Sequence, residues 1–189
     1  LRVLAYDLSG KLLWSVRHGD AWLNQYQGAR TSVTYHHGLL YVQNAHGRIA
    51  CLDAATGKEV WNVDLMKRFG AENITWGFSE CLLVDERAVY ATAGGRDAMI
   101  VALAPRTGAV VWKIPQLDPA ADKLESASYA APILVQFANR RLLIGCTQRQ
   151  LYCADADSGI LQWTRPRPTT YSVLASSPVL VGESVFMTA

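Results

Sequence analysis

One short phrase recurs four times in this chain, and each copy ends in a tryptophan. The copies read YDLSGKLLW, DAATGKEVW, APRTGAVVW and DADSGILQW, and occupy 6–14, 53–61, 104–112 and 155–163. Successive tryptophans are 47, 51 and 51 residues apart. A repeat of this length is typical of solenoids, propellers and other arrays, in which each unit buries its faces against its neighbours. The repeat therefore limits the fold to a repetitive architecture and gives the tryptophans a structural role.

Each unit contains four short apolar segments separated by turn residues. The segments are rich in β-branched and aromatic side chains with near-alternating polarity, which is typical of strands, and no helical stripe of comparable length occurs. We therefore expect strands at 32–37, 39–45, 48–54, 59–65, 81–85, 88–93, 99–104, 109–114, 131–137, 141–147, 150–156 and 160–165.

A glycine marks the turn before the last strand of each unit. Gly57, Gly108 and Gly159 each follow Thr or Ser, and they stand where a hairpin needs a positive φ. Ser9-Gly10 has the same role in a turn that is one residue shorter. Because a tryptophan follows each glycine by four residues, a large ring occupies the same slot in every unit. We expect this ring to pack between neighbouring units.

Four antiparallel strands per ~45-residue unit predict a β-propeller, in which neighbouring blades cover one another's faces. The phrase and its period resemble the pyrroloquinoline-quinone (PQQ) β-propeller repeat. That repeat occurs in quinoprotein alcohol dehydrogenases, including polyvinyl-alcohol dehydrogenases, and in an outer-membrane assembly lipoprotein. The resemblance covers nearly the whole chain, although Ala104 replaces the usual Asp and the turn before Gly10 is short. It implies an all-β fold of four-stranded antiparallel blades, about four blade equivalents of an eight-bladed propeller.

The expected blades divide the chain into whole and half units. Whole blades are expected at 31–65, 79–114 and 131–165, whereas 1–16 resembles the last two strands of a blade and 175–189 the first two. We therefore expect a segment of a longer protein. Because the two halves are complementary, we expect a homodimer in which each half-blade completes the partner's, giving an eight-bladed ring with C2 symmetry. Closure of four blades within one chain is the alternative.

The composition is that of an ordinary globular β-protein, with 50% hydrophobic and 18% charged residues and a net charge of +2. Dispersed basic residues argue against a nucleic-acid partner, and no apolar run reaches the ~18–20 residues that would span a membrane. Cys51 and Cys153 share a repeat slot with Ala5 and Ala102, as small buried residues do, and no CxxC spacing occurs. We expect four free thiols. The resemblance implies a periplasmic or otherwise exported location.

The connections between blades are the longest loops, and long loops on a rigid scaffold usually carry function. They occupy 17–31, 66–80, 115–130 and 166–176. The first contains His18, Asp20 and Trp22, residue types that suit a pocket. In a propeller these connections share one face with the turns between second and third strands. The turns that contain the repeat glycines lie on the other face, with the first hairpins.

Two of these loops contain the residue types that a quinone site needs. Trp76 lies outside the repeat slot, and Glu80 replaces a small residue at the start of an inner strand. The turn 94–98 is longer than its counterparts and adds Arg96 and Asp97. An anionic quinone needs an aromatic surface and Arg, its Ca²⁺ needs oxygen ligands, and alcohol oxidation needs a carboxylate base.

The resemblance therefore implies a site for PQQ and Ca²⁺. The catalytic candidates are Glu80 and Asp97, the metal-ligand candidates are Glu80 and Asn73, and the cofactor-binding candidates are Trp76, Arg96, Tyr129 and Tyr171. Structural alternatives exist for each. The aromatic residues are also suited to covering a seam between blades, Glu80 to binding backbone N–H groups, and the Arg–Asp pair to a solvated ion pair.

Two functions are compatible with the repeat, because the repeat builds blades and not sites. The first is a segment of a quinoprotein alcohol dehydrogenase-like enzyme that oxidises an alcohol, of the secondary or polyvinyl-alcohol type. The second is a non-catalytic exported propeller that binds other proteins. The sequence favours the first as ancestry.

Overall fold

A computed structural model of the chain describes residues 1–118, 120, 124–167 and 173–188. In these residues the strands form three four-stranded and two two-stranded antiparallel sheets. The N-terminal half-blade contains β1 (Arg2–Tyr6) and β2 (Leu12–Arg17). The first blade contains β3 (Thr34–His36), β4 (Leu39–Gln43), β5 (Arg48–Asp53) and β6 (Glu59–Asp64). The second contains β7 (Leu83–Val84), β8 (Val89–Gly95), β9 (Ala98–Leu103) and β10 (Val110–Ile114). The third contains β11 (Ile133–Phe137), β12 (Arg140–Cys146), β13 (Gln150–Asp155) and β14 (Leu161–Pro166), and the C-terminal half-blade contains β15 (Val179–Val181) and β16 (Ser184–Phe186).

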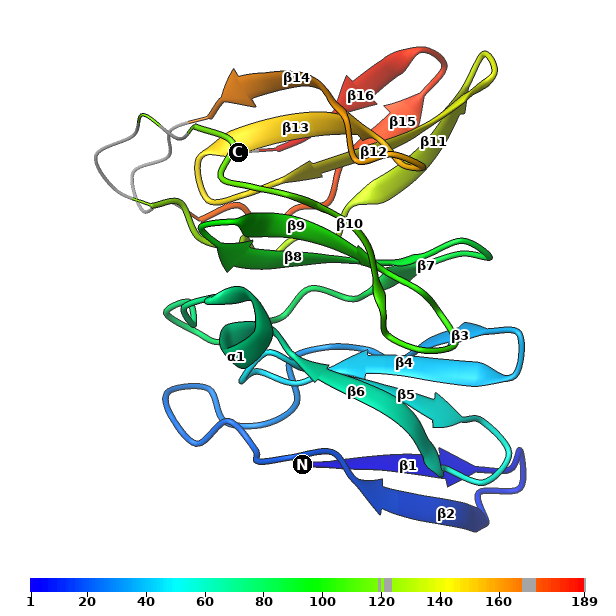
Figure 1. The fold of residues 1–189 in the computed structure, drawn as a ribbon. Helices are drawn as coiled ribbons and strands as arrows, with labels where there is room; N and C mark the ends of the chain where they lie inside the picture. Colours follow the sequence, from blue (N-terminus) through cyan, green and yellow to red (C-terminus); the bar gives the residue numbers. More distant parts are fainter. Residues whose placement is uncertain (119, 121–123, 168–172, 189) are drawn as a thin grey trace.

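Within each blade the strands pair in chain order, as a meander. The sheets are stacked face to face, with the N-terminal half-blade at one end of the stack and the C-terminal half-blade at the other (Figure 1). The expectation of an all-β chain built from four-stranded antiparallel blades is therefore confirmed.

The hydrophobic core lies between the blades. One cluster joins the first and second blades, and another joins the second and third. The second blade is covered on both faces, so every residue of β8 and β9 is buried, whereas every residue of β15 and β16 is exposed. Because sheets that are buried on both faces have no solvent side, the polar alternation that identifies a strand is weakest in the second blade.

The repeat tryptophans close the seams between blades. Trp14, Trp61 and Trp112 each donate an indole N–H to a carbonyl of the next blade, that of Ala54, Pro105 and Ala156, at 3.2, 2.7 and 3.0 Å. A Cβ on the glycine of that blade's turn would lie only 2.6–2.8 Å from the indole. The ring therefore packs between units, as expected, and the turn needs glycine both for its positive φ and for the space that the ring occupies.

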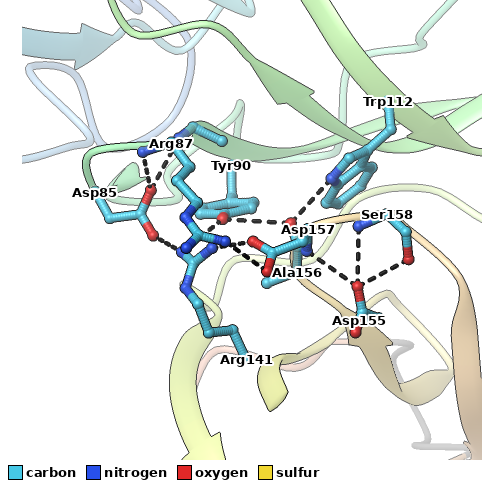
Figure 2. A network of polar contacts seen from close by, with 10 residues as sticks. Asp85, Arg87, Tyr90, Trp112, Arg141, Asp155, Ala156, Asp157 and Ser158 are labelled. Atoms are coloured by element: carbon cyan, nitrogen blue, oxygen red, sulfur yellow. Dashed lines mark hydrogen bonds and ion pairs between the residues drawn. The ribbon is translucent and has the colours of Figure 1, made fainter. Parts of the chain in front are cut away.

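Polar contacts reinforce the seam between the second and third blades (Figure 2). Arg141 of β12 binds Asp85 of the second blade and Asp157 of its own blade, and Arg87 donates to Asp157 at 2.7 Å. The side chain of Arg141 is only 16% exposed. This network lies beside the Trp112 contact, so one seam combines a docked ring with charge pairing across the blades.

The loops sort onto two sides of the stack. The turns between β1 and β2, β3 and β4, and β5 and β6 lie on one side, here called the hairpin face, and the connections between blades lie on the other, the connection face (Figure 1). The connection face also holds α1 (Leu65–Phe69), a short helix that the sequence pattern did not indicate. Asp64 caps its first turn by accepting from Lys67 N, and Gly70 ends it with φ 63°. No helix within the described residues is long and apolar enough to cross a membrane.

All four cysteines are free, as expected. Cys51, Cys146 and Cys153 are buried within the stack, whereas Cys81 is partly exposed. Burial raises the pKa of Cys51 and of Cys146 to about 11, so both are thiols at neutral pH.

Candidate functional site

Two of the aromatic candidates meet on the connection face. The rings of Trp76 and Tyr129 have centroids 5.6 Å apart and planes tilted by 44°. The backbone N–H of Trp76 donates to the Tyr129 hydroxyl at 3.3 Å, and both side chains are half-buried. A parallel slot would need parallel rings, so a flat ligand would lie against one ring rather than between the two. Tyr171, the third candidate, lies outside the described residues.

Asn73 holds the connection 66–80 against the first blade. Its Nδ2 donates to the carbonyl of Ala45 at 2.9 Å, and its Oδ1 accepts from the N–H of Ile74 at 2.9 Å. The same Ala45 carbonyl accepts from Phe78 N at 3.1 Å. Both ends of the Asn73 amide therefore have partners within the fold, and its contacts are those of a residue that shapes a loop.

Glu80 is buried in the seam between the second and third blades, with only 1% of its surface exposed. Its Oε2 accepts from the backbone N–H of Thr92 on β8 at 2.9 Å. Burial raises the pKa of Glu80 to about 7, against the opposing effect of the Thr92 hydrogen bond. At neutral pH a substantial fraction of this carboxyl is therefore protonated.

Three oxygens near Glu80 have no hydrogen-bond partner among the described residues. They are Oε1 of Glu80, the Thr92 hydroxyl and the hydroxyl of Tyr152 on β13. Burial raises the pKa of Tyr152 well above its usual value, and the Glu80 charge raises it further. The sequence pointed to Glu80 because a carboxylate replaced a small residue. It gave no signal for Thr92 or Tyr152, since both occupy ordinary strand positions.

Arg96 and Asp97 form the tip of the turn between β8 and β9. Both are exposed, and neither makes an ion pair with any described residue. The carbonyl of Arg96 accepts from Gln116 N at 2.9 Å, which fixes the turn to the next connection. The structure thus places the pair in solvent, whereas Glu80 lies inside a seam.

His18, in the first connection, is also buried. Its Nδ1 lies 3.1 Å from a guanidinium nitrogen of Arg48, and Arg48 in turn binds Glu59 at 2.6 Å. Burial and the neighbouring Arg48 charge lower the pKa of His18 to about 4. His18 is therefore neutral at physiological pH and supports the entry of the connection into the first blade.

These residues match one part of a quinone site. The half-buried rings of Trp76 and Tyr129 offer an aromatic surface of the kind that a quinone needs. The metal is not matched, because no three His, Cys, Asp or Glu side chains of the described residues lie together as ligands. Glu80 is sealed in a seam and the Asn73 amide is engaged within its loop. The described residues thus fit the ring of a quinone but not its Ca²⁺.

Comparison with known proteins places these observations in a family. The model of the PQQ-repeat family described as "Outer membrane protein assembly factor BamB" matches residues 2–189. The quinoprotein ethanol dehydrogenase of Pseudomonas aeruginosa is 30% identical in an alignment of 168 residues that covers 81% of this chain and 25% of that protein. Further curated relatives also have names of quinone-dependent alcohol dehydrogenases, and this chain spans about a fifth to a quarter of their length.

Two solved structures share the fold. The quinohemoprotein alcohol dehydrogenase of Comamonas testosteroni superposes with a TM-score of 0.66 and 16% identity, over 98% of this chain and 36% of that one. BamB of Moraxella catarrhalis superposes with a TM-score of 0.61 and 19% identity, over 98% of this chain and 48% of that one. At these identities the likeness shows the propeller fold alone.

Proposed function

The chain belongs to the PQQ-repeat propeller family described as outer membrane protein assembly factor BamB, and we propose that it forms blades of an alcohol-oxidising propeller of the quinoprotein type. The observation that carries this proposal is the set of curated relatives, which align over most of the chain and have names of quinone-dependent alcohol dehydrogenases. The substrate class is an alcohol, with secondary and polyvinyl alcohols the first to test. The protein is exported, in keeping with the family description.

The aromatic pair on the connection face is the contribution of this chain to the cofactor site. Trp76 and Tyr129 present half-buried rings from two different connections, against which the flat face of PQQ packs. Arg96 is exposed at the end of β8, and its guanidinium is suited to a carboxylate of the quinone. When bound, PQQ supplies the oxidising chemistry, and the protein orients it.

Glu80 has a structural role in this proposal. Its carboxyl holds the start of the second blade's inner strand to Thr92 and is only 1% exposed. We assign it no ligand bond and no proton transfer, because its carboxyl is enclosed between the second and third blades.

A second candidate function is supported by the family model, whose description is that of an outer-membrane assembly factor rather than of an enzyme. BamB of Moraxella catarrhalis also shares the propeller fold over 98% of this chain. A propeller that binds other proteins, without a cofactor, is the alternative to the enzyme.

A thermal melt of this chain with PQQ plus Ca²⁺, with each alone and with neither, distinguishes the two functions. A ligand that binds only the folded form raises the melting temperature of the protein. At a concentration of one hundred times its Kd, such a ligand adds about 2.7 kcal/mol to the free energy of unfolding. We expect the shift in the unsubstituted chain and its loss in Trp76→Leu and Tyr129→Leu. The matched control is Tyr35→Leu, which removes an exposed ring from the hairpin face and should keep the shift.

The opposite results have clear meanings. An unchanged melting temperature in a cooperatively unfolding protein would reject quinone binding and favour the protein-binding propeller. A shift that survives both Trp76→Leu and Tyr129→Leu would place the quinone away from the aromatic pair.

A further inference from the structure

The two seams between whole blades are built to the same plan on the hairpin face. The first seam joins the first and second blades, and the second seam joins the second and third. In each, a tyrosine and the repeat tryptophan of one blade donate to the same carbonyl of the next blade. The two donors and the acceptor are Tyr41, Trp61 and Pro105 in the first seam, and Tyr90, Trp112 and Ala156 in the second. The surroundings of these contacts can therefore be compared position by position.

In the second seam a guanidinium fills the space beside this contact. Arg141 lies between the carboxylates of Asp85 and Asp157, and it also donates to the Tyr90 hydroxyl at 3.3 Å (Figure 2). It reaches this place because β11 and β12 stay paired as far as Arg140, near the tip of a long hairpin. A positive group thus occupies a position between two negative groups.

The first seam has basic residues at the two positions where the second seam has acidic ones. His36 closes the β3–β4 hairpin as Asp85 closes the β7–β8 hairpin, each bonded to the residue three positions later. Arg106 directly follows the Pro105 acceptor, as Asp157 follows the acceptor of the second seam. Surroundings that bind a positive group in the second seam are therefore replaced by surroundings suited to a negative group.

The space that corresponds to the Arg141 position is an open pocket in the first seam. The β7–β8 hairpin has fewer strand pairs than the β11–β12 hairpin, so the second blade reaches less far over its neighbour. The pocket has a volume of about 390 Å³, which lies within the range of small-molecule sites. Leu39, Tyr41 and Pro105 supply an apolar part of its lining.

Two basic side chains at this pocket have nitrogen atoms without partners. The Arg106 side chain is exposed and makes no hydrogen bond or ion pair with any described residue. Its charge acts on the seam, because burial raises the pKa of Tyr41 and the Arg106 charge opposes that rise. Nε2 of His36 is buried and has no hydrogen-bond partner in the described part of the chain. A buried polar atom without a partner destabilises a protein, and a ligand that bonds to it removes that cost.

Glu86 is the one acidic residue among the described residues that line the pocket, and it has a partner. Its Oε1 lies 3.9 Å from Nε2 of His37, and both side chains are largely exposed. His37 in turn packs against His36, with ring centroids 4.3 Å apart. Arg106 therefore remains the unpaired charge at the pocket.

We propose that this pocket binds a small organic carboxylate. Its carboxylate accepts from the Arg106 guanidinium, which can bind such a group through two parallel hydrogen bonds, and from His36 after a rotation of the imidazole ring. Its hydrocarbon part packs on the apolar lining that Leu39, Tyr41 and Pro105 supply. The ligand thus completes the first seam with a charge opposite in sign to the one that Arg141 brings to the second.

The pocket is separate from the aromatic pair that we assign to the quinone. It lies at the β3–β4 and β9–β10 turns, whereas Trp76 and Tyr129 belong to connections between blades. Binding of a carboxylate here therefore does not depend on whether a quinone binds.

Calorimetric titration with benzoate and with butyrate, in the absence of PQQ and Ca²⁺, tests the proposal. These probes are an aromatic and an aliphatic monocarboxylate that are small enough for the pocket. We expect at least one of them to bind with a Kd of about 1 mM or tighter. Benzamide has nearly the same size and shape as benzoate but no charge, so it should bind at least about tenfold more weakly.

Substitutions at Arg106 locate the site. Arg106→Gln should weaken binding of the carboxylate at least about tenfold, which corresponds to 1.4 kcal/mol. Arg106→Asp introduces the acid that stands at this position in the second seam, and it should abolish binding. Arg87→Gln is the matched control, because it removes an exposed arginine that belongs to the second seam, and it should leave the affinity unchanged. Thermal melts of all three variants check that each is folded.

Four results would overturn the proposal. They are no binding of either carboxylate, equal binding of benzamide and benzoate, an affinity that Arg106→Gln leaves unchanged, and a loss of binding in Trp76→Leu. The last would place the carboxylate at the aromatic pair instead of the first seam. A failure of PQQ to raise the melting temperature would not affect the carboxylate titration, so the two proposals can fail separately.

Discussion

The indole of Trp61 lies directly on Gly108 of the next blade, and its Nε1 donates to the carbonyl of Pro105 at 2.7 Å. A Cβ on Gly108 would be 2.7 Å from the ring, closer than real Cβ contacts occur. The same pairing joins Trp14 to Gly57 and Trp112 to Gly159. One short phrase thus supplies both halves of a contact between blades that are adjacent along the chain.

Gly108→Ala should destabilise the stack more than an ordinary loop substitution. The positive φ alone costs about 1–2 kcal/mol for a residue with a Cβ, and the collision with Trp61 adds about 1–3 kcal/mol. Gly38→Ala is the matched control, because Gly38 has φ +80° and nothing within 4 Å. Urea unfolding followed by tryptophan fluorescence measures both. Equal losses of stability would show that the ring does not depend on the missing Cβ.

Arg141→Met should weaken the seam between the second and third blades by about 1–3 kcal/mol. The substitution keeps most of the aliphatic length but leaves Asp85 and Asp157 without their shared partner in a partly buried place. Arg87→Met removes a more exposed member of the same network and should cost under about 0.5 kcal/mol. Chemical denaturation in low and high salt measures both changes. If the Arg141→Met effect vanished in salt, the network would be a surface feature.

Glu80→Gln should make the protein more stable at high pH. The folded pKa of about 7 lies above the ordinary value of 4.5, so the folded state binds the proton more tightly than the unfolded state. Stability therefore falls as pH rises from about 4.5 to about 7, by up to about 3 kcal/mol, and then stays level. Gln keeps an acceptor for Thr92 N and cannot ionise. The stability that Glu80→Gln gains over the unsubstituted chain should be full at pH 8 and absent at pH 4.5. Thermal melts at both pH values measure this gain, and a gain of equal size at both would contradict the prediction.

His18→Asn should remove a pH dependence of stability that is opposite in sign to the one caused by Glu80. The folded pKa of about 4 lies below the ordinary 6.5, so the unfolded state takes up the proton first. Stability is therefore lost as pH falls from about 6.5 to about 4, again by up to about 3 kcal/mol. Between pH 4.5 and 6.5 the two groups offset each other. In this pH range the stability of the unsubstituted chain should stay constant. The stability of Glu80→Gln should rise with pH, and that of His18→Asn should fall with pH.

Thiol labelling should count one reactive cysteine in the native protein. Cys81 is partly exposed, whereas Cys51, Cys146 and Cys153 are buried within the stack. A colorimetric thiol reagent should therefore label one site before denaturation and four after it. In Cys81→Ser the native reaction should disappear, and a remaining fast-reacting thiol would show that a seam opens.

Much of the fold could be predicted because its signals are local. The Gly–Trp spacing, the turn residues and the alternating segments all act within about ten residues, and every expected strand is present. Four of these strands, β8, β9, β12 and β14, extend one or two residues beyond the expected ranges. Even the packing of the tryptophans between units followed from their single slot per repeat. The helix α1 was missed because five residues are too few to show a helical period.

The candidate site was less predictable, because residue types do not give burial. The sequence placed Glu80, Asn73, Trp76, Arg96 and Asp97 on one face as the parts of a single site. In the structure Glu80 is sealed in a seam, Asn73 is engaged within its loop, and Arg96 and Asp97 are in solvent.

The sequence by itself determined the structure of the blade, because the residues that specify its strands, its turns and its tryptophan position all lie within one repeat. Only the tertiary structure decided what surrounds Glu80. Tyr152 comes from a strand more than seventy residues away, and nothing in the sequence around Tyr152 indicates that it lies near Glu80. The same holds for Trp76 and Tyr129, which come from different connections and meet where two blades are stacked. A repeat specifies its own unit locally, whereas a side chain's burial and charge state depend on which unit is packed against it.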